Sequence, residues 1–213
     1  MQMQQNKINY QKQLDKIIEN IESQGASMPV LVLHACCAPC SSYCLEYLSK
    51  YFTIKLLYYN PNISIREEYE KRLLEVHRFV DEFVEKTAAN NPDIEVVDGR
   101  YISSEFFDAV RGYEKCPEGG DRCRICYELR MREAAVLAKE IGATYFTTTL
   151  SISPLKKSEV INEIGQALAK EFGIEHLPSD FKKREGYKKS IELSKEYNLY
   201  RQNYCGCIFS KSE

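Results

Sequence analysis

Apolar and polar side chains follow two kinds of pattern along this chain, and each kind predicts one type of element. Residues 8–23 carry apolar side chains at helical spacing among charged ones, which predicts an amphipathic leading helix. Residues 29–35 and 52–59 are short, nearly continuous apolar runs, which indicate buried strands. Shorter runs at 94–97 and 143–148 predict a third and a fourth strand.

Helical patterns fill the segments between these runs. We expect helices up to residue 50 after the first strand and at residues 65–86, 103–112, 121–142, 158–172 and 183–197. Pro39 suits the first turn of its helix, Ser103 or Ser104 suits a helix N-cap, and Gly142 suits a helix end. Strands that alternate with helices predict an α/β fold, in which a parallel sheet has helices on both faces.

Loops that follow strand ends are the expected place for a functional site. In an open parallel sheet the ligand crevice lies beyond the carboxyl ends of the strands. Residues 36–42, 60–64 and 149–154 all follow predicted strands. We therefore expect these three loops to face one site.

Composition and charge exclude several classes of protein. The chain has 213 residues, 44% of them hydrophobic, and a formal net charge of −2. No apolar run approaches the roughly 20 residues that a membrane helix needs, and the polar start is unlike a signal peptide. We expect a cytoplasmic protein without a membrane partner, folded as a single domain over residues 1–213, with a basic, Tyr-rich segment at 178–213.

Nine cysteines are unusual for a chain in a reducing compartment, because thiols there stay free unless a metal or catalysis uses them. Six of them form three close pairs: Cys36 and Cys37, Cys123 and Cys126, and Cys205 and Cys207. The first pair lies where a strand turns into a helix, which lowers thiol pKa values. The second pair has the spacing of zinc and iron–sulfur sites, and the third could form a strained, easily reduced disulfide.

Four thiolates complete a zinc site or an iron–sulfur cluster, so three pairs are one pair too many. The simplest division assigns the first two pairs to a metal centre and leaves Cys205 and Cys207 for redox exchange. A structural zinc needs no spare dithiol, so this division favours iron and sulfur over zinc. Cys40 forms a CxxC spacing with Cys37 and is a substitute ligand, Cys44 suits packing, and Cys116 has no assigned role.

Five motifs in order resemble the QueH family of epoxyqueuosine reductases. They are LHACCAPC at 33–40, YYNPNI at 58–63, DRCRICY at 121–127 with Arg130, TTTLSISP at 147–154 and YCGC at 204–207. The resemblance implies reduction of epoxyqueuosine to queuosine at the wobble position of tRNA, the final step of queuosine biosynthesis. It also implies a [4Fe-4S] cluster, no cobalamin, and a fold like that of adenine-nucleotide hydrolases and PP-loop ATPases.

The implied reaction requires proton donors, a source of electrons and a surface that binds tRNA. Proton-donor candidates beside the motifs are Asp121, Tyr127, His34 and Tyr59, although Asp121 equally suits a helix N-cap and His34 a core position. An additional iron beside the cluster could bind the leaving oxygen, and an external electron donor would reset the dithiol. Candidate contacts to substrate or tRNA are Asn60, Arg130, Lys156, Lys182, Lys183, Arg184, Lys188 and Arg201.

The tRNA itself would carry a queuosine-type GUN anticodon. Residues 178–211 hold eight basic and four acidic side chains with tyrosines between them, and aromatic rings can stack on splayed bases. A solvated helix face is the alternative reading of that segment. Two other functions also remain open: a PP-loop-like nucleotide-dependent tRNA thiolase or ligase, and a zinc-stabilised nucleic-acid-binding module.

Overall fold

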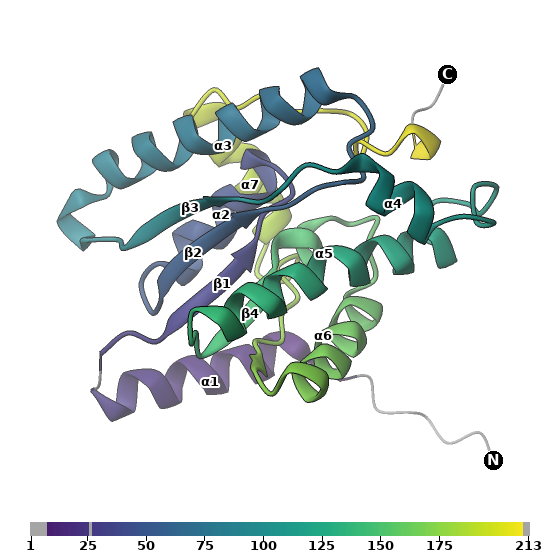
Figure 1. Cartoon of the computed structure of the whole chain (residues 1–213). Helices are drawn as coiled ribbons and strands as arrows, with labels where there is room; N and C mark the ends of the chain where they lie inside the picture. Colours follow the sequence, from purple (N-terminus) through teal and green to yellow (C-terminus); the bar gives the residue numbers. More distant parts are fainter. Residues whose placement is uncertain (1–7, 26, 211–213) are drawn as a thin grey trace, which may run out of the picture.

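The computed structural model describes residues 8–25 and 27–210, in which five strands form one parallel sheet (Figure 1). The strands are β1 (Val30–His34), β2 (Thr53–Tyr58), β3 (Ile94–Asp98), β4 (Tyr145–Thr148) and β5 (Glu175–His176). Their spatial order is β3-β2-β1-β4-β5. The chain winds outward from β1 in both directions, so the predicted α/β class is confirmed.

Seven α-helices of the described residues cover the sheet. They are α1 (Tyr10–Gln24), α2 (Ala38–Leu48), α3 (Arg66–Lys86), α4 (Ser103–Ala109), α5 (Asp121–Glu140), α6 (Ser158–Phe172) and α7 (Gly186–Glu196). Short 3-10 turns are η1 (Ala88–Asn90), η2 (Thr149–Ile152) and η3 (Ile208–Ser210). None of the helices in this part of the chain has the length and apolar character that crossing a membrane requires.

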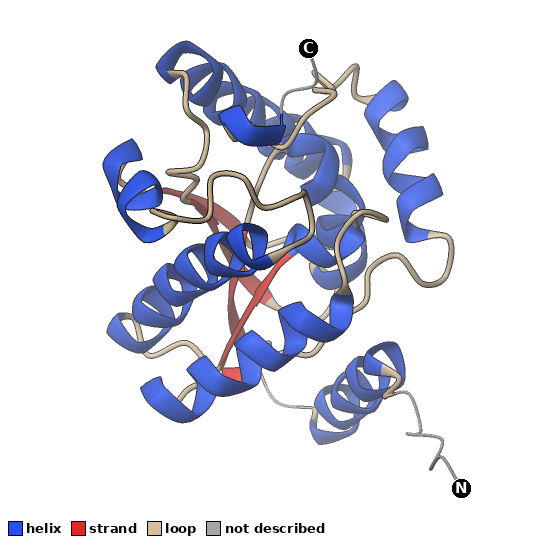
Figure 2. Ribbon diagram, turned by 90° about the vertical axis from the view of Figure 1, so that its right-hand side faces the viewer, coloured by secondary structure: helices blue, strands red, loops and turns tan. Residues whose placement is uncertain are grey.

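The sheet separates two hydrophobic cores, as its alternating side chains require. Leu31 and Leu33 of β1 pack with residues of α1, α2, α3 and α7, whereas Val32 packs with residues of α5 and α6. Figure 2 shows the strands enclosed between these helical layers. Both faces of β1 are therefore buried, which explains why the strand reads as a continuous apolar run.

Several predicted boundaries need correction. The N-cap of α4 is Ile102 and not Ser103 or Ser104, and the N-cap of α5 is Gly120, so that Asp121 is the first helical residue. α7 begins at Gly186 instead of residue 183. β5 is absent from the predictions, because a strand of two residues carries no readable pattern. Gly142 does follow α5 with a positive φ of 66°, as expected.

The strand order places a crevice between β1 and β4. β2 is the neighbour of β1 toward one edge of the sheet, and β4 is its neighbour toward the other edge. The loops after β1 and β4 therefore lead away from each other and leave a crevice between them. The backbone N–H of Cys36, after β1, donates to Oγ1 of Thr149, after β4, over 3.3 Å. Two of the three loops expected to face one site are thus in direct contact.

Candidate functional site

Three cysteine sulfurs gather where β1 turns into α2. Cys36 and Cys37 follow the strand, and Cys40 lies in the first turn of the helix. Their Sγ atoms all lie within 4.8 Å of one another, and those of Cys36 and Cys37 are 3.8 Å apart. Pro39 lies in the first turn of the helix, where no N–H partner is lost. Because thiolates bind soft metals, this group could hold a metal ion.

The three thiols share charge unequally. Hydrogen bonds from Cys37 and Cys40 hold the pKa of Cys36 well below its ordinary value, and the nearby Lys156 acts in the same direction. The same hydrogen bond raises the pKa of Cys37 to about 12, and the pKa of Cys40 is raised as well. The group therefore favours one thiolate at Cys36, supported by two thiols.

A second group of cysteines comes from α5 and the C-terminal segment. Cys126 and Cys207 are buried and pack together with Phe106 and Val110. Cys123 is partly buried, and its sulfur accepts the Gly119 N–H over 3.2 Å. Burial raises the pKa of Cys126 to about 12, and the neighbouring cysteines add to that shift. The predicted ligands Cys123 and Cys126 lie outside the compact group around Cys36.

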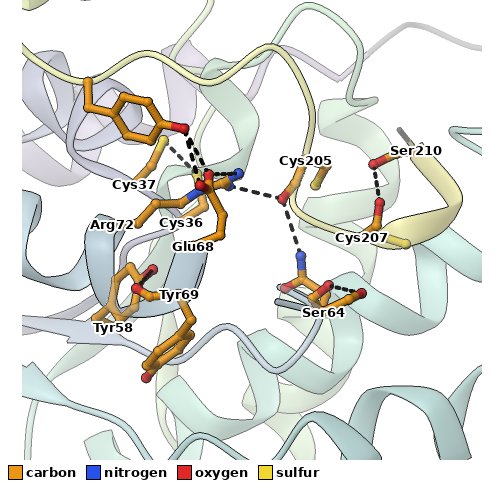
Figure 3. A network of polar contacts seen from close by, with 12 residues as sticks. Cys36, Cys37, Tyr58, Ser64, Glu68, Tyr69, Arg72, Cys205, Cys207 and Ser210 are labelled. Carbon is orange, nitrogen blue, oxygen red and sulfur yellow. Dashed lines mark hydrogen bonds and ion pairs between the residues drawn. The ribbon is translucent and has the colours of Figure 1, made fainter. Parts of the chain in front are cut away.

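The segment that carries Cys205 and Cys207 is fixed through its backbone (Figure 3). The Cys205 carbonyl accepts from Nη1 of Arg72 over 3.3 Å and from Nδ2 of Asn62 over 3.4 Å. The Gly206 carbonyl accepts the Ser64 N–H over 3.1 Å. These contacts leave both side chains as free thiols, which the expected redox role requires.

Arg72 is the residue that the sequence analysis missed. Its side chain is 2% exposed, and Glu68 one helical turn earlier pairs with it at 2.7 Å. Glu68 also accepts a hydrogen bond from the Tyr200 hydroxyl, so the ion pair joins α3 to the C-terminal segment. A signal was present, because Arg72 lies three residues after Tyr69 and four before Val76, both buried on the same helix.

Two further cations lie between the cysteine groups. Arg130 of α5 is fully buried. Within the described residues it donates to the Cys126 carbonyl over 3.3 Å and to Asn60 Oδ1 over 3.4 Å, and its Nη2 has no partner there. No ion pair joins Arg130 or Lys156 to a carboxylate of the described residues. Burial lowers the pKa of both side chains, but nearby cysteines raise it more. Cys126, Cys205 and Cys36 raise the pKa of Arg130, and Cys205 and Cys36 raise that of Lys156. Cysteines of both groups therefore interact electrostatically with the same two cationic side chains, Arg130 and Lys156.

A cavity of about 410 Å³ opens over this arrangement. Its walls include Cys36, Cys37 and Cys40 from one group and Cys205 from the other. Lys156 lines it as well. Its size lies in the range of small-molecule sites. The cavity thus brings the β1–α2 thiols and the Cys205 thiol to one space, whereas Cys207 is buried beside Cys126.

The buried candidates for proton transfer do not line that cavity. His34 is fully buried; its Nε2 donates to the Tyr59 carbonyl over 3.0 Å, so its Nδ1 accepts from the Thr148 hydroxyl over 2.9 Å. Burial lowers the pKa of His34 to about 3, which keeps the ring neutral. The Tyr59 hydroxyl donates to Glu105, and burial raises the pKa of Tyr59. Their part in proton transfer stays a prediction.

The remaining proton-donor candidates, Tyr127 and Asp121, lie on α5, and the candidate substrate contact Asn60 lies in the loop after β2. Tyr127 is 5% exposed and packs in the core beside α6, and Asp121 starts α5. Asn60 is 1% exposed; its Nδ2 donates to the Ala35 carbonyl over 2.9 Å, and its Oδ1 accepts from Arg130. Asn60 therefore fixes the turn after β1 and orients Arg130. None of the three residues lines the cavity.

Lys182, a candidate tRNA contact, is engaged inside the protein. Its Nζ donates to the Ser151 carbonyl over 2.9 Å and to the Lys156 carbonyl over 3.2 Å. It also pairs with Asp180 at 2.9 Å. Because all three ammonium protons have acceptors, Lys182 braces the loop that carries Lys156.

The other basic candidates are more open. Arg184 pairs with Asp15 at 2.8 Å and Lys188 with Glu185 at 3.6 Å, and Lys183 is exposed. Arg201 donates to Ser194 Oγ over 2.9 Å and lines the cavity, whereas Lys211 lies outside the described residues. Among the spare cysteines, Cys44 is fully buried in the core, as expected for packing, and Cys116 is partly buried in a loop.

Comparison with known proteins gives a consistent result. A sequence model of the family described as "Epoxyqueuosine reductase QueH" matches residues 31–213. Similar proteins with that name include one from Streptococcus pyogenes, 41% identical over 96% of this chain and 78% of the relative. One from Staphylococcus epidermidis is 41% identical over 98% and 87%, and one from Thermotoga maritima is 35% identical over 87% and 92%.

Proposed function

Because the chain belongs to the QueH family of epoxyqueuosine reductases, we propose that it reduces epoxyqueuosine to queuosine at the wobble position of a tRNA with a GUN anticodon. It is an oxidoreductase, and tRNA is its substrate. The observation that carries the finer proposal is the cavity where thiols from the β1–α2 turn and from the C-terminal segment meet. The proposed place of action is the cytoplasm.

Conversion of an epoxide to an alkene takes up two electrons and two protons and releases water. When Cys205 and Cys207 pass from dithiol to disulfide, they release two electrons and two protons, so one dithiol balances one epoxide. An external electron donor then reduces the disulfide. The fixed carbonyls of Cys205 and Gly206 support this role, because they hold the backbone while the sulfurs remain free to react.

We propose a [4Fe-4S] cluster as the resident cofactor. When bound, such a cluster supplies one-electron transfer and a Lewis-acidic iron. The residues present fit an anionic, thiolate-bound group, because the fully buried guanidinium of Arg130 and the ammonium of Lys156 have no carboxylate partner in the described residues. A buried cation without a counter-charge is costly, so an anion beside it is favoured.

Cys36, Cys37, Cys123 and Cys126 are the proposed ligands of that cluster. Their chemistry supports the assignment, since soft thiolates suit iron–sulfur centres. Cys40 is the alternative donor, since its sulfur lies within 4.8 Å of those of Cys36 and Cys37. Where Cys40 is not a cluster ligand, its thiol offers a donor for an additional iron ion. The proposal includes no cobalamin.

Anaerobic reconstitution tests the cofactor and the reaction together. The protein should bind iron and sulfide in cluster stoichiometry, and nucleoside analysis of treated tRNA should show epoxyqueuosine converted to queuosine. A colourless protein that carries zinc alone and remains active would refute the cluster. Individual Cys→Ser changes at positions 36, 37, 40, 123 and 126, each followed by iron analysis, identify the ligands.

The dithiol needs its own variants. Cys205→Ser and Cys207→Ser should abolish turnover while iron and sulfide content stays at the wild-type level. Cys116→Ser is the matched control, because that partly buried cysteine is outside the cavity and should leave both readouts unchanged. Equal loss of iron in the Cys205 or Cys207 variant would place that residue among the metal ligands instead.

A further inference from the structure

The part of the cavity wall that the reaction does not use has an unusual composition. Leu155 and Tyr187 both line the cavity, and they are 69% and 38% exposed. Large apolar side chains in the open are uninformative singly, but two on the wall of one cavity indicate a surface that a flat apolar group covers. Enzymes that act on a nucleobase hold it by stacking on such side chains.

Gln202 adds an unsatisfied polar atom to the lining of the same cavity. It lines the cavity, and its Oε1 is buried without a hydrogen-bond partner among the described residues. Most buried polar atoms in proteins have a partner, so an orphaned acceptor in a ligand cavity indicates a donor on the ligand. The cavity lining also includes the carboxylate of Glu118, another acceptor.

We propose that Tyr187 and Gln202 form the subsite for the base of the substrate. In this subsite the ring of Tyr187 stacks on the modified guanine, and Gln202 Oε1 accepts from its N1–H and exocyclic amino group. Guanine offers these two adjacent donors on its Watson–Crick edge, whereas inosine lacks the amino group. The cysteines that line the same cavity then face the modified part of the nucleotide. This inference rests on the proposed function, since it takes the tRNA wobble base as the occupant.

Binding of unmodified anticodon stem-loops tests the subsite without turnover. Two labelled loops, with guanine or inosine at the wobble position, are titrated with the reconstituted protein and followed by fluorescence anisotropy. The wild type should prefer the guanine loop roughly fivefold, as expected for one hydrogen bond. Gln202→Leu should weaken guanine binding roughly tenfold and remove the preference, whereas Gln202→Glu, which keeps the acceptor, should retain it.

Changes at Tyr187 give a second, independent readout. Tyr187→Ala should weaken both loops by a similar factor, roughly tenfold, because stacking does not depend on the edge of the base. Tyr187→Phe keeps the ring and should bind as the wild type does. Gln166→Leu is the matched control for Gln202, because Gln166 is exposed on α6 away from the cavity wall. Far-UV circular dichroism confirms that each variant is folded.

Three outcomes would overturn the subsite. They are equal binding of both loops by the wild type, a guanine preference that survives Gln202→Leu, and wild-type binding by Tyr187→Ala. Failure of the proposed function is a different result, because it is measured as absent reduction of epoxyqueuosine in tRNA. A protein that binds with the expected preference but does not reduce its substrate keeps the subsite and loses the reaction.

Discussion

Lowering the pH should destabilise this protein through one buried histidine of β5. His176 is 8% exposed, its ring lies 5.3 Å from that of Phe146, and neither ring nitrogen has a hydrogen-bond partner in the described residues. A Cβ added to Gly165 of α6 would lie 2.2 Å from its Nε2, so the ring packs directly against α6. Burial lowers the pKa of His176 to about 4 from the usual 6.5.

The sign follows from which state binds the proton. Below about pH 6.5 the unfolded chain protonates this histidine, while the native state does not do so until about pH 4. The contribution of neutral His176 to the free energy of unfolding is therefore fully present above pH 6.5, and it is lost progressively as the pH falls toward 4. A pKa shift of this size contributes about 3 kcal/mol to the free energy of unfolding at high pH, and about 2 kcal/mol of this contribution is lost between pH 7.5 and pH 5.0.

Urea unfolding at those two pH values measures the effect. His176→Leu removes the titrating ring, so its free energy of unfolding should change by about 2 kcal/mol less than that of the wild type between the two conditions. Other titrating groups are the same in both proteins and cancel. Phe146→Leu is the control: it weakens the same packing but should keep the wild-type pH dependence. Identical pH dependence in His176→Leu and the wild type would refute this reasoning.

The remaining predictions concern the C-terminal segment and the tRNA surface. Gly206→Ala places a Cβ at a φ of +99° and should destabilise the local fold of the C-terminal segment by about 1–3 kcal/mol. Because the segment then opens more often, Cys205 and Cys207 should be alkylated faster, and an unchanged alkylation rate would contradict this prediction. Arg72→Met leaves Glu68 without its partner and should lower the free energy of unfolding by about 3 kcal/mol in urea, whereas a neutral effect would mean that the pair is solvated. Lys183 is exposed, so Lys183→Met should reduce the slope of log K against log salt for tRNA binding by about one phosphate contact. Lys182 is held inside the protein, so Lys182→Met should leave that slope unchanged. Equal slopes for the two variants would contradict this assignment.

Local sequence patterns were sufficient for most elements of the sheet and its helices. β1 is apolar on both faces because two cores enclose it, and Pro39 marks the start of α2. The expectation that loops after strands converge depends only on a parallel sheet, and the contact of Cys36 with Thr149 agrees with it. These features rest on interactions within a few residues or on topology, so a single sequence contains them.

Features set by distant contacts were less accessible. The start of α7 moves to Gly186 because Arg184 and Glu185 adopt left-handed φ values, which side-chain periodicity does not encode. β5 forms because His176 pairs with Phe146 of β4, not because of its own two residues. Likewise the compact sulfur group contains Cys40, which had been only a substitute ligand, since one helical turn brings it to Cys37.

Two buried arginines near the cysteines differ in how their charge is balanced. Arg130 is fully buried, and Arg72 is nearly so, yet only Arg72 has a carboxylate partner in the described part of the chain. The paired cation fixes the backbone of Cys205, whereas Arg130 is held by a carbonyl and an amide oxygen. Because Arg130 has no carboxylate partner among the described residues, its charge supports the proposed anionic cluster near the cysteine groups. Under the proposed function, the residue that destabilises the cluster-free protein also increases the affinity of the site for the proposed cluster.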